Sequence, residues 1–542
     1  MRREYPLVCA ILLAVIGCAA CGGAPTDEPV GGPSHDNVVR ILLSADPASL
    51  SMLGKVDGNA ERVNILLTDS LVQYDAALQL QPRVAASWEV SDDRKTVTFH
   101  LRDGVRWHDG TAVTADDVVF TIEKVREPAI ENKTYGPLFR DVESIEAVDR
   151  STVRVRYTVT SPDFLESWRV PLLPRHLAGV EEDLLTSEFS RHPVGCGPFR
   201  FASYRHGQEI VLEANDDYWD GRPSIDRLVF KIYPDQRTAY QALFLGDLDL
   251  MKVSPELWNE ARQSDAGERL SAIVYSTLAV WPVVWNQDGS NPFFTDVRVR
   301  KALASALDRD EFADKVAHGL ARPGITTYHP DSVWADAALE PRSFDRAEAE
   351  RLLDEAGWRD TDGDGIRDKE GQDFRFTLLI PNSSMQLTQQ IAVWQQDAWE
   401  RIGIQAEIER MEWQAFRERR NAGDFEAVSF LLRFSPNPDQ FELYHSSATE
   451  TGFNFYGLND AEIDRLVELG RATFDESERM AIYGQLQKAL YEREPITCTF
   501  NFASPVLYDH RLSGVRASPL GVLLTTDGPP RWRWTDDAAP ED

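Results

Sequence analysis

"TVTFHLRDGVRWHDGTAVTADDVVFTIEKV", residues 96–125, joins the two kinds of secondary structure from which this fold is built. Apolar side chains alternate at its start, where Val97, Phe99 and Leu101 fall on one face, and this period of two predicts a strand. Thr114 then precedes an apolar repeat of helical period with acids in its first turn, which is typical of an N-capped amphipathic helix. The stretch therefore predicts a strand followed by a helix.

Both periodicities recur along the rest of the chain. Further strands are predicted at residues 152–159, 226–234 and 374–381. Further helices are predicted at residues 299–308, 345–357, 391–403 and 460–473. Strands and helices mix throughout and no long internal repeat is visible, so the predicted class is α/β or α+β with several lobes.

Length and charge limit the range of functions. A chain of 542 residues is long enough for two or three domains with large cores. The net charge of −31 argues against nucleic acid and against anionic lipid surfaces, because neither would be attracted to such a protein.

The N-terminus carries a targeting pattern. Arg2 and Arg3 precede an apolar run that is too short to span a bilayer but suits a secretion signal. The following "VIGCAACGG" resembles the bacterial lipoprotein box, with Cys18 as the predicted lipidated residue and Cys21 as the alternative. A signal peptide at residues 1–18 and a flexible tether at 19–36 would leave the protein outside the cytoplasm, held to the membrane by lipid. A plain secretory signal is the other interpretation.

Motifs of known catalytic sites are missing from the sequence. There is no G-x-S-x-G, H-E-x-x-H, G-x-x-x-x-G-K or G-x-G-x-x-G pattern, and the ten histidines are scattered. The 88 acidic residues leave room for a pair of glycosidase-type carboxylates, which have no fixed spacing. We therefore predict that the protein is not an enzyme, with a secreted hydrolase as the alternative.

Long stretches of the chain resemble one known family. "LQPRVAASWEVSDDRKTVTFHLRDGVRWHDGTAVTADDVVFTIEKV" at residues 80–125 is similar to a signature of the family 5 extracellular solute-binding proteins, the peptide/nickel-type receptors of ABC importers. The resemblance continues at "HPVGCGPFRFASYRHGQEIVLEANDDYWDGRPSIDRLVFKIYPD" (192–235) and at "NPFFTDVRVRKALASALDRDEF" (291–312). It covers about residues 37–515 in order.

The resemblance implies an α/β, two-lobed periplasmic-binding-protein-like fold with two hinge strands and an extra subdomain inserted in the first lobe. Ligand would bind between the lobes, which close around it by hinge motion. The implied boundaries are 37–75, 190–283 and 500–535 for the first lobe, 76–189 for the inserted subdomain, and 284–499 for the second lobe.

The resemblance also implies a function. We expect a monomeric receptor that captures a solute outside the cytoplasm and delivers it to the permease subunits of an ABC importer. A receptor-like lipoprotein that signals or acts as a chaperone without transport is an alternative.

The Asp/Gly-rich stretch "DTDGDGIRDKEG" at residues 360–371 has two interpretations. Asp360, Asp362, Asp364 and Asp368 match positions of a calcium loop, but the position of the bidentate glutamate is taken by Gly371. The stretch also suits a plain solvated turn, in which aspartates accept hydrogen bonds from nearby N–H groups. We expect no cofactor other than this possible structural calcium.

Two cysteines remain beyond the N-terminal region, Cys196 and Cys498. An oxidising compartment would permit a disulfide between them, and two separate buried thiols are the alternative.

Matching of motifs to the resembled family suggests ligand contacts. Residues 274–286 correspond to the segment that leads from the first lobe into the second and lines the cleft. The implied contacts are Ser44, Trp281, Trp285, Asn286, Asn454 and Tyr456.

The predicted ligand class follows from one position at which this sequence differs from the peptide-binding members of the family. Its peptide-binding members place an aspartate just before a Pro-Asp-Pro-like motif, where it pairs with the free α-amino group of the ligand. In "LLRFSPNPDQF" (431–441), Phe434 takes that place beside Arg433. A ring and a guanidinium suit a carboxylate, phosphate or sugar hydroxyl better than an ammonium. We therefore predict a peptide-like or oligosaccharide-like solute whose recognition does not depend on a free N-terminus.

Overall fold

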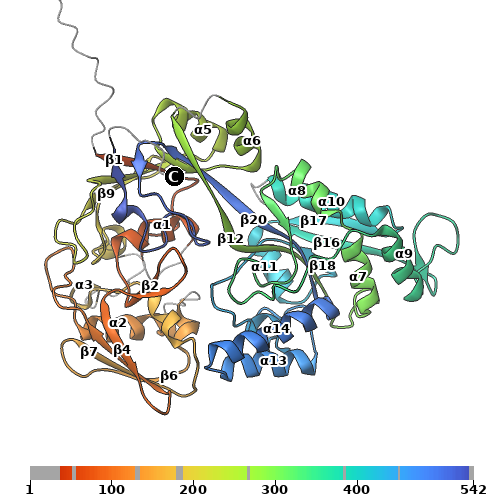
Figure 1. Ribbon diagram of the computed structural model, residues 1–542, viewed down its shortest axis with the longest axis horizontal. Coiled ribbons are helices and arrows are strands. Elements are labelled where there is room, and N and C mark those ends of the chain that lie inside the picture. Colours follow the sequence, from red (N-terminus) through yellow and green to blue (C-terminus); the bar gives the residue numbers. More distant parts are fainter. Residues whose placement is uncertain are drawn as a thin grey trace, which may run out of the picture. The chain divides into compact units, whose positions relative to one another are not determined.

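The computed structural model describes residues 37–51, 57–128, 135–178, 187–264, 269–382, 386–449 and 452–535. Their largest element is a sheet of twelve strands (Figure 1). In order of pairing, its strands are β17 (Gln405–Met411), β16 (Arg375–Pro381), β18 (Ala427–Ser429), β12 (Leu270–Trp285), β20 (Ile496–Asp509), β11 (Leu250–Lys252), β1 (Val38–Leu43), β10 (Arg227–Ile232), β9 (Glu209–Ala214) and β8 (Phe199–Arg205). Off this path, β13 (Ala321–Pro323) pairs with β20 and β19 (Leu432–Arg433) pairs with β12.

Two long antiparallel strands, β12 and β20, connect the halves of this sheet. At one end β20 pairs with β11, where Val506 lies opposite Lys252. At the other end β12 pairs with β18, where Val283 lies opposite Ser429. We call the half with β1 and β8–β11 the first lobe and the half with β16–β18 the second lobe. The chain passes between the lobes along β12 and β20, which are therefore its hinge strands.

The first lobe forms around the parallel pair of β1 and β10. Both strands bury their apolar residues, so helix α1 (Gly58–Leu67) can pack against the same core. The carboxylate of Asp57 caps α1 by accepting hydrogen bonds from the N–H groups of Asn59 and Ala60. Helices α5 (Gln236–Leu245) and α6 (Pro255–Gln263) cover β11 and the nearby end of β12 with a separate core.

An antiparallel sheet of four strands forms the inserted subdomain. Its order is β4 (Ala85–Val90), β5 (Thr96–Leu101), β7 (Thr152–Tyr157) and β6 (Val142–Ala147). Helix α2 (Ala115–Val125) contacts this sheet and begins with a capping box between Thr114 and Asp117. The strand and helix predicted within residues 96–125 are thus confirmed, and Val97 and Phe99 are fully buried.

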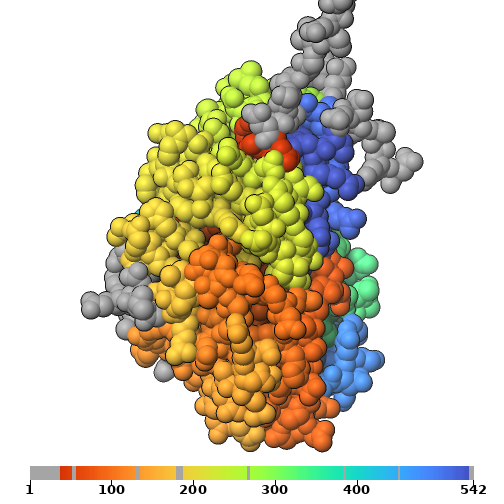
Figure 2. All heavy atoms as spheres, turned by 90° about the vertical axis from the view of Figure 1, so that its left-hand side faces the viewer, coloured from red at the N-terminus to blue at the C-terminus, as the bar shows by residue number. Residues whose placement is uncertain are grey.

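Short elements complete the first lobe and the inserted subdomain. They are β2 (Val72–Tyr74), β3 (Leu80–Pro82), η2 (Gly136–Phe139), η3 (Phe164–Arg169), α3 (Arg175–Ala178), α4 (Glu188–Arg191), β21 (Leu512–Ser513), η6 (Pro529–Arg531) and β22 (Arg533–Trp534). In Figure 2 the orange atoms, which include the inserted subdomain, lie below the yellow and green atoms of the first lobe.

The second lobe packs helices around β16–β18. These helices are α7 (Val297–Ser305), α8 (Arg309–Lys315), α9 (Arg346–Glu355), α10 (Gln386–Glu400), α11 (Trp413–Asn421), α12 (Phe441–Tyr444), η5 (Ser446–Thr449), α13 (Ala461–Ala472) and α14 (Glu476–Arg493). A small hairpin joins β14 (Asp368–Lys369) to β15 (Gln372–Asp373). Helices α7, α9, α10 and α13 confirm the four further helices predicted from the sequence, and β7, β10 and β16 confirm the three further strands.

The possible disulfide between Cys196 and Cys498 is wrong. Both residues are buried free thiols. Cys196 packs in the core of the first lobe and inserted subdomain, with its Sγ 3.9 Å from the Thr68 hydroxyl, whereas Cys498 packs in a core of the second lobe. Each thiol therefore belongs to a different core.

The predictions for the N-terminal segment lie outside the described residues. They concern the signal peptide at 1–18, the tether at 19–36, and lipidation of Cys18 or Cys21. Within the described ranges, none of the helices has the length and apolar character needed to span a bilayer.

Candidate functional site

A cavity of about 390 Å³ lies between the lobes. Tyr74, Asp163 and Glu166 line it from the side of the first lobe and inserted subdomain. Residues 327–334 and 434–440 line it from the side of the second lobe. We call this space the interlobe cavity. Because both sides contribute to its wall, its shape depends on how the lobes are arranged about β12 and β20.

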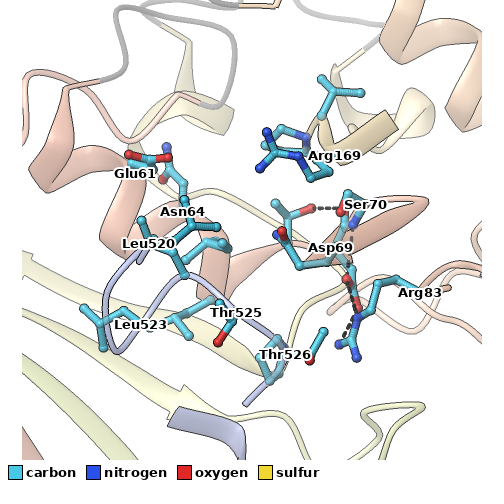
Figure 3. Close-up of a pocket in the computed structure, with 18 of the residues that line it drawn as sticks. Glu61, Asn64, Asp69, Ser70, Arg83, Arg169, Leu520, Leu523, Thr525 and Thr526 are labelled. Atoms are coloured by element: carbon cyan, nitrogen blue, oxygen red, sulfur yellow. Dashed lines mark hydrogen bonds and ion pairs between the residues drawn. The ribbon is translucent and has the colours of Figure 1, made fainter. Parts of the chain in front are cut away.

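A second cavity of about 370 Å³ lies within the first lobe (Figure 3). Helix α1, η3 and the C-terminal segment around residues 520–526 form its walls. In Figure 3, Glu61 and Asn64 of α1 lie across this space from Arg169 and Asp69. We call it the first-lobe cavity. Glu166 lines both cavities, so the two spaces adjoin at η3.

One wall of the first-lobe cavity is a closed polar network. The Asp69 carboxylate accepts hydrogen bonds from the Tyr218 hydroxyl at 2.9 Å and from the Trp219 indole at 3.0 Å. Arg83 forms ion pairs with Asp69 at 3.2 Å and with Asp220 at 3.2 Å. These groups satisfy one another, so this wall is rigid and contributes shape more than free hydrogen-bonding capacity.

Another wall has polar groups without partners. Asn64 is 3% exposed, and neither its amide nitrogen nor its amide oxygen makes a hydrogen bond. The Nε of Arg169 is likewise buried without a partner. A buried polar group without a hydrogen bond costs about 1–3 kcal/mol. Both residues line the cavity, so its contents can satisfy them.

Glu166, at the junction of the two cavities, is a titratable group with an altered acidity. Burial raises its pKa to about 7, against the lowering effects of the Tyr74 hydroxyl and of Arg169. The nearby Asp163 carboxylate raises the pKa further, and the Asn437 side chain of the second lobe lowers it. Residues of both lobes therefore control the charge of Glu166.

Direct contacts join the inserted subdomain to the second lobe beside the interlobe cavity. Arg479 of α14 binds both carboxylate oxygens of Asp163, one of them at 2.8 Å. Arg140 pairs with Glu442 of α12 at 2.7 Å. Asp163 lines the interlobe cavity, so its pair with Arg479 holds that part of the wall against the second lobe.

The structure places the predicted contacts Trp281, Trp285 and Asn286 inside the protein. The Trp281 indole donates to the Ser429 hydroxyl at 3.0 Å, and the Trp285 indole donates to the Thr497 hydroxyl at 2.9 Å. Asn286 is fully buried and donates to the backbone carbonyl of residue 425 at 2.9 Å. These side chains belong to the cores on which the hinge strands rest, and neither cavity is lined by them.

Asn454 and Tyr456 are also interior. The Asn454 amide donates to the carbonyl of His445 at 3.0 Å, and the Tyr456 hydroxyl donates to the carbonyl of Leu443 at 2.9 Å. Ser44 is exposed just after β1 and lines neither cavity.

Arg433 and Phe434 lie where the second lobe meets β12. Arg433 is exposed and lies opposite Ala279 of β12. Phe434 lines the interlobe cavity and also packs against a core of the second lobe. Phe434 therefore both faces the cavity and packs in the second lobe.

The structure brings together three of the four predicted calcium ligands. Carboxylate oxygens of Asp360, Asp362 and Asp364 lie within 4.8 Å of one another at the surface. Asp368 instead accepts hydrogen bonds from the N–H and hydroxyl of Thr361. Calcium binding here stays a prediction.

Sequence reasoning missed several residues at these cavities. Asn64 could have been found, because an amide interrupts the apolar face of α1. The sequence around Glu166 and around Arg479 contains no pattern that predicts a binding site. Both residues reach the cleft only because the start of η3 contacts α14 in the folded protein. The missed set is Glu61, Asn64, Glu166, Arg169 and Arg479.

Comparisons with known proteins match most of the chain. The sequence model of the bacterial extracellular solute-binding proteins, family 5 Middle, matches residues 79–454. The oligopeptide-binding protein AppA of Bacillus subtilis (strain 168) is 29% identical, with 96% of this chain and 97% of the relative covered. Protein XP55 of Streptomyces lividans is 31% identical, with 90% of this chain and 88% of the relative covered.

Solved structures share the fold. AppA from Bacillus subtilis in complex with a nonapeptide is similar at a TM-score of 0.77 and 28% identity, covering 92% of this chain and 99% of that structure. NikZ from Campylobacter jejuni in complex with Ni(L-His) is similar at a TM-score of 0.78 and 25% identity, covering 92% and 99%. These similarities confirm the predicted two-lobed α/β fold.

Proposed function

Because the chain belongs to the bacterial extracellular solute-binding proteins of family 5, it is a solute receptor that acts outside the cytoplasm, and we propose that its solute is peptide-like and binds in the interlobe cavity. The solute would then be delivered to the permease subunits of an ABC importer. The observation that carries this proposal is the cavity itself, which has walls from both sides of the hinge strands.

This geometry supports capture by hinge closure. A solute that contacts both lobes is bound more tightly in the closed arrangement than in the open one, and that difference shifts the population toward the closed form. An importer can then distinguish loaded from empty receptors.

The peptide-like class is supported by the relatives and by the size of the site. AppA of Bacillus subtilis, which is similar over nearly its whole length, is named as an oligopeptide-binding protein. The interlobe cavity of about 390 Å³ adjoins a further 370 Å³, which together suit an extended solute. Phe434 stands where the resembled peptide receptors place the aspartate for a free amine, so recognition would not depend on that amine.

An oligosaccharide or another non-peptide solute is the second candidate. Trp334 and Phe434 are half-buried aromatic residues in the wall of the interlobe cavity, and aromatic faces suit stacking on sugar rings.

The mode of membrane attachment and the assembly state belong to the proposal too. We infer a lipid anchor on Cys18, with Cys21 as the alternative, and a monomer. The relatives named as binding proteins support a role in binding without catalysis.

A thermal-shift screen tests the function. Purified protein is heated with free dipeptides, N-blocked peptides, oligosaccharides and metal chelates. We expect peptides to raise the melting temperature whether or not the amine is blocked. Phe434→Ala should reduce the rise, whereas Trp413→Ala, which removes an exposed ring of α11 outside both cavities, should not.

Three results would contradict parts of this proposal. Stabilisation by free peptides that disappears on N-acetylation would show that the amine is recognised. Stabilisation by oligosaccharides alone would favour the second candidate. Turnover of a peptide or oligosaccharide during incubation would identify a hydrolase.

A further inference from the structure

Asn64 is a polar residue on the buried face of α1. It is 3% exposed and shares that face with Ala60, Val63, Leu66 and Leu67. Within the described residues, neither its amide nitrogen nor its amide oxygen has a hydrogen-bond partner. Asparagine also has a lower helix propensity than leucine, which has a similar volume. In the empty protein, the Asn64 side chain therefore lowers the stability of the fold and gives nothing in return.

Helix α1 is fixed at both ends, which fixes the position of Asn64. The Asp57 carboxylate caps its start. At its end the N–H of Gly197 donates to the Leu67 carbonyl at 3.0 Å. The two backbones approach so closely that a Cβ at Gly197 would lie 2.6 Å from the carbonyl carbon of Leu67. A shift of α1 that would bring the Asn64 amide to another partner is therefore opposed from both ends.

The first-lobe cavity, which Asn64 lines, offers this amide no partner from its polar wall (Figure 3). The Ser70 hydroxyl donates to the Val72 carbonyl at 2.7 Å. The Asp69 carboxylate accepts from the Tyr218 hydroxyl at 2.9 Å. These groups would have to give up existing hydrogen bonds to turn toward Asn64. The partner of the amide must therefore come from the contents of the cavity.

Much of the remaining wall is apolar. Its apolar residues include Ile65, Val170, Leu520, Leu523 and Leu524. A hydrogen bond is stronger in such surroundings, and an ionised group is disfavoured there unless it is paired. This part of the cavity therefore suits an uncharged polar group on an apolar stem.

The Arg169 side chain lies across the cavity from Asn64 in Figure 3, and its Nε is also buried without a partner. This N–H can donate to a carbonyl oxygen of a solute. The charge of Arg169 would also favour an anion, so a carboxylate has to be included among the probes.

The shape of the Asn64 amide determines which group complements it. A primary amide has an N–H donor and a C=O acceptor side by side. A trans peptide group cannot pair with both, because its own N–H and C=O point to opposite sides. A primary carboxamide can, and so can the edge of a lactam ring, since each has a donor and an acceptor on the same side. We call this arrangement a carboxamide edge.

We propose that Asn64 recognises a carboxamide edge of the solute inside the first-lobe cavity. The inference rests on the proposed function and names a chemical group of the solute. A solute with this edge satisfies both atoms of the Asn64 side chain, whereas a solute without it leaves them buried and unpaired. The rest of the solute extends past Glu166 into the interlobe cavity. Asn64 is then a residue that determines specificity.

Probes that present one side chain at every position test this recognition without knowledge of the binding register. They are N-acetyl-triglutamine, N-acetyl-triglutamate and N-acetyl-trimethionine, and 2-pyrrolidinone serves as a lactam without a peptide. Dissociation constants are measured by calorimetry, with thermal shift as a second readout. We expect triglutamine to bind at least about tenfold tighter than the other two tripeptides, because these leave one or both atoms of the Asn64 amide unpaired.

Asn64→Leu replaces the amide by an apolar side chain of similar volume. The preference for triglutamine should fall to about threefold or less. The melting temperature of the empty protein should stay the same or rise, because a buried polar group without a partner is removed. Asn64→Thr is the second test variant and should also reduce the preference, which guards against misfolding of a single variant.

Gln395 of α10 provides a matched control. It is fully buried, and neither its amide nitrogen nor its amide oxygen has a partner within the described part of the chain. Unlike Asn64, it lines neither the first-lobe cavity nor the interlobe cavity. Gln395→Met should therefore affect stability as Asn64→Leu does and keep the wild-type preference for triglutamine. This pair separates recognition of the solute from the general effect of removing a buried amide.

Two positive results identify the source of the carboxamide edge. A preference for triglutamine that is lost in both Asn64 variants would identify a side-chain carboxamide. Binding of 2-pyrrolidinone that weakens in both variants, without a preference among the tripeptides, would identify a lactam. If 2-pyrrolidinone alone binds and requires Asn64, the inference stands and the peptide-like solute does not.

The remaining results overturn the inference. Equal binding of the three tripeptides, together with binding of 2-pyrrolidinone that does not depend on Asn64, would do so while the peptide receptor stands. Tighter binding of triglutamate would assign the cavity to an anion. A preference for triglutamine that survives in both Asn64 variants, or that is lost equally in Gln395→Met, would exclude recognition by Asn64. If none of the four probes binds the wild type more tightly than Asn64→Leu, the inference is also overturned.

Discussion

Two arginines at the boundary between the lobes differ in their partners. Arg479 of α14 is 4% exposed and binds both oxygens of Asp163 in the inserted subdomain, so its charge is neutralised within the protein. Arg433 of β19 is exposed and forms no ion pair with a carboxylate in the described structure. The Arg479 contact stabilises the present arrangement without solute. The Arg433 guanidinium is left to solvent.

This difference shows that residues at the boundary between the lobes do not all stabilise the same arrangement of the lobes. Ion pairs that join the lobes lower the free energy of their present arrangement, whereas an exposed side chain without an ionic partner does not. The predictions that follow change one kind of residue at a time.

The largest expected effect comes from breaking the complete pair. Arg479→Gln leaves the Asp163 carboxylate without its partner, and removal of one member of a buried ion pair costs about 3–5 kcal/mol. We expect the lower end of this range, because opening of the lobes lets Asp163 return to water. Thermal unfolding should then begin about 3 °C lower, given the entropy of unfolding of a chain of this size. An unchanged midpoint would show that the contact contributes nothing to stability.

A double-mutant cycle sharpens this result. Asp163→Asn alone should also destabilise the protein, and the combined variant should lose less than the sum of the two single changes. Small-angle scattering of the same variants reports whether the lobes separate. Additive losses would mean that Arg479 acts through Gly470 and its other contacts in the second lobe rather than through Asp163.

The next-largest expected effect is a pH dependence of stability that is caused by Glu166. Its folded-state pKa of about 7 lies above the ordinary value of 4.5, so between these values the folded protein holds a proton that the unfolded chain has lost. Stability therefore falls as pH rises through this window, by at most about 3 kcal/mol for a shift of this size. The groups that face Glu166 are Tyr74, Asp163 and Arg169 on its own side and Asn437 on the second lobe.

Substitution isolates that pH dependence. Glu166→Gln should flatten the difference in melting temperature between about pH 5 and pH 8, because the amide does not titrate. Glu407→Gln, at an exposed acid of β17 that lines neither cavity, is the matched control and should keep the wild-type slope. A slope that persists in Glu166→Gln would assign the dependence to other groups.

A smaller effect is expected from the unpaired side of the comparison. Arg433→Gln in the absence of any solute removes an exposed guanidinium that forms no ion pair with a carboxylate in the described structure. The free energy of unfolding should change by less than about 1 kcal/mol, the range usual for exposed charges. A larger loss of stability would show that Arg433 already has a favourable role in the empty receptor.

The sequence predicts the scaffold better than the site, for a physical reason. Strand and helix periods are local, so the stretch at 96–125 and the four further helices could be derived from neighbouring residues alone. Trp281 and Trp285 were expected in the cleft because they stand on a hinge strand, but their indoles donate to Ser429 and Thr497 inside the second lobe. The alternation along a strand does not tell which face meets the cavity when both faces are covered.

The smallest effect is expected at the acidic loop of residues 360–371. Asp360 already accepts hydrogen bonds from the N–H groups of Gly363 and Gly365, at 2.6 and 3.0 Å. Asp368 is turned to Thr361, and Gly371 offers no carboxylate where a calcium loop has its bidentate glutamate. The loop therefore satisfies itself as a turn, and we expect the same melting temperature in chelator and in calcium.

The rise in melting temperature that calcium binding would cause can be calculated. Calcium at about 1 mM acting on a site with a dissociation constant of about 10 μM would stabilise the folded form by about 2.7 kcal/mol. That gain would raise the melting temperature by about 2–3 °C in a chain of this size. A rise of this kind in the wild type that disappears in Asp362→Asn would show that the exposed carboxylates of Asp360, Asp362 and Asp364 do hold calcium, and that a surface loop of the second lobe is stiffened far from the hinge.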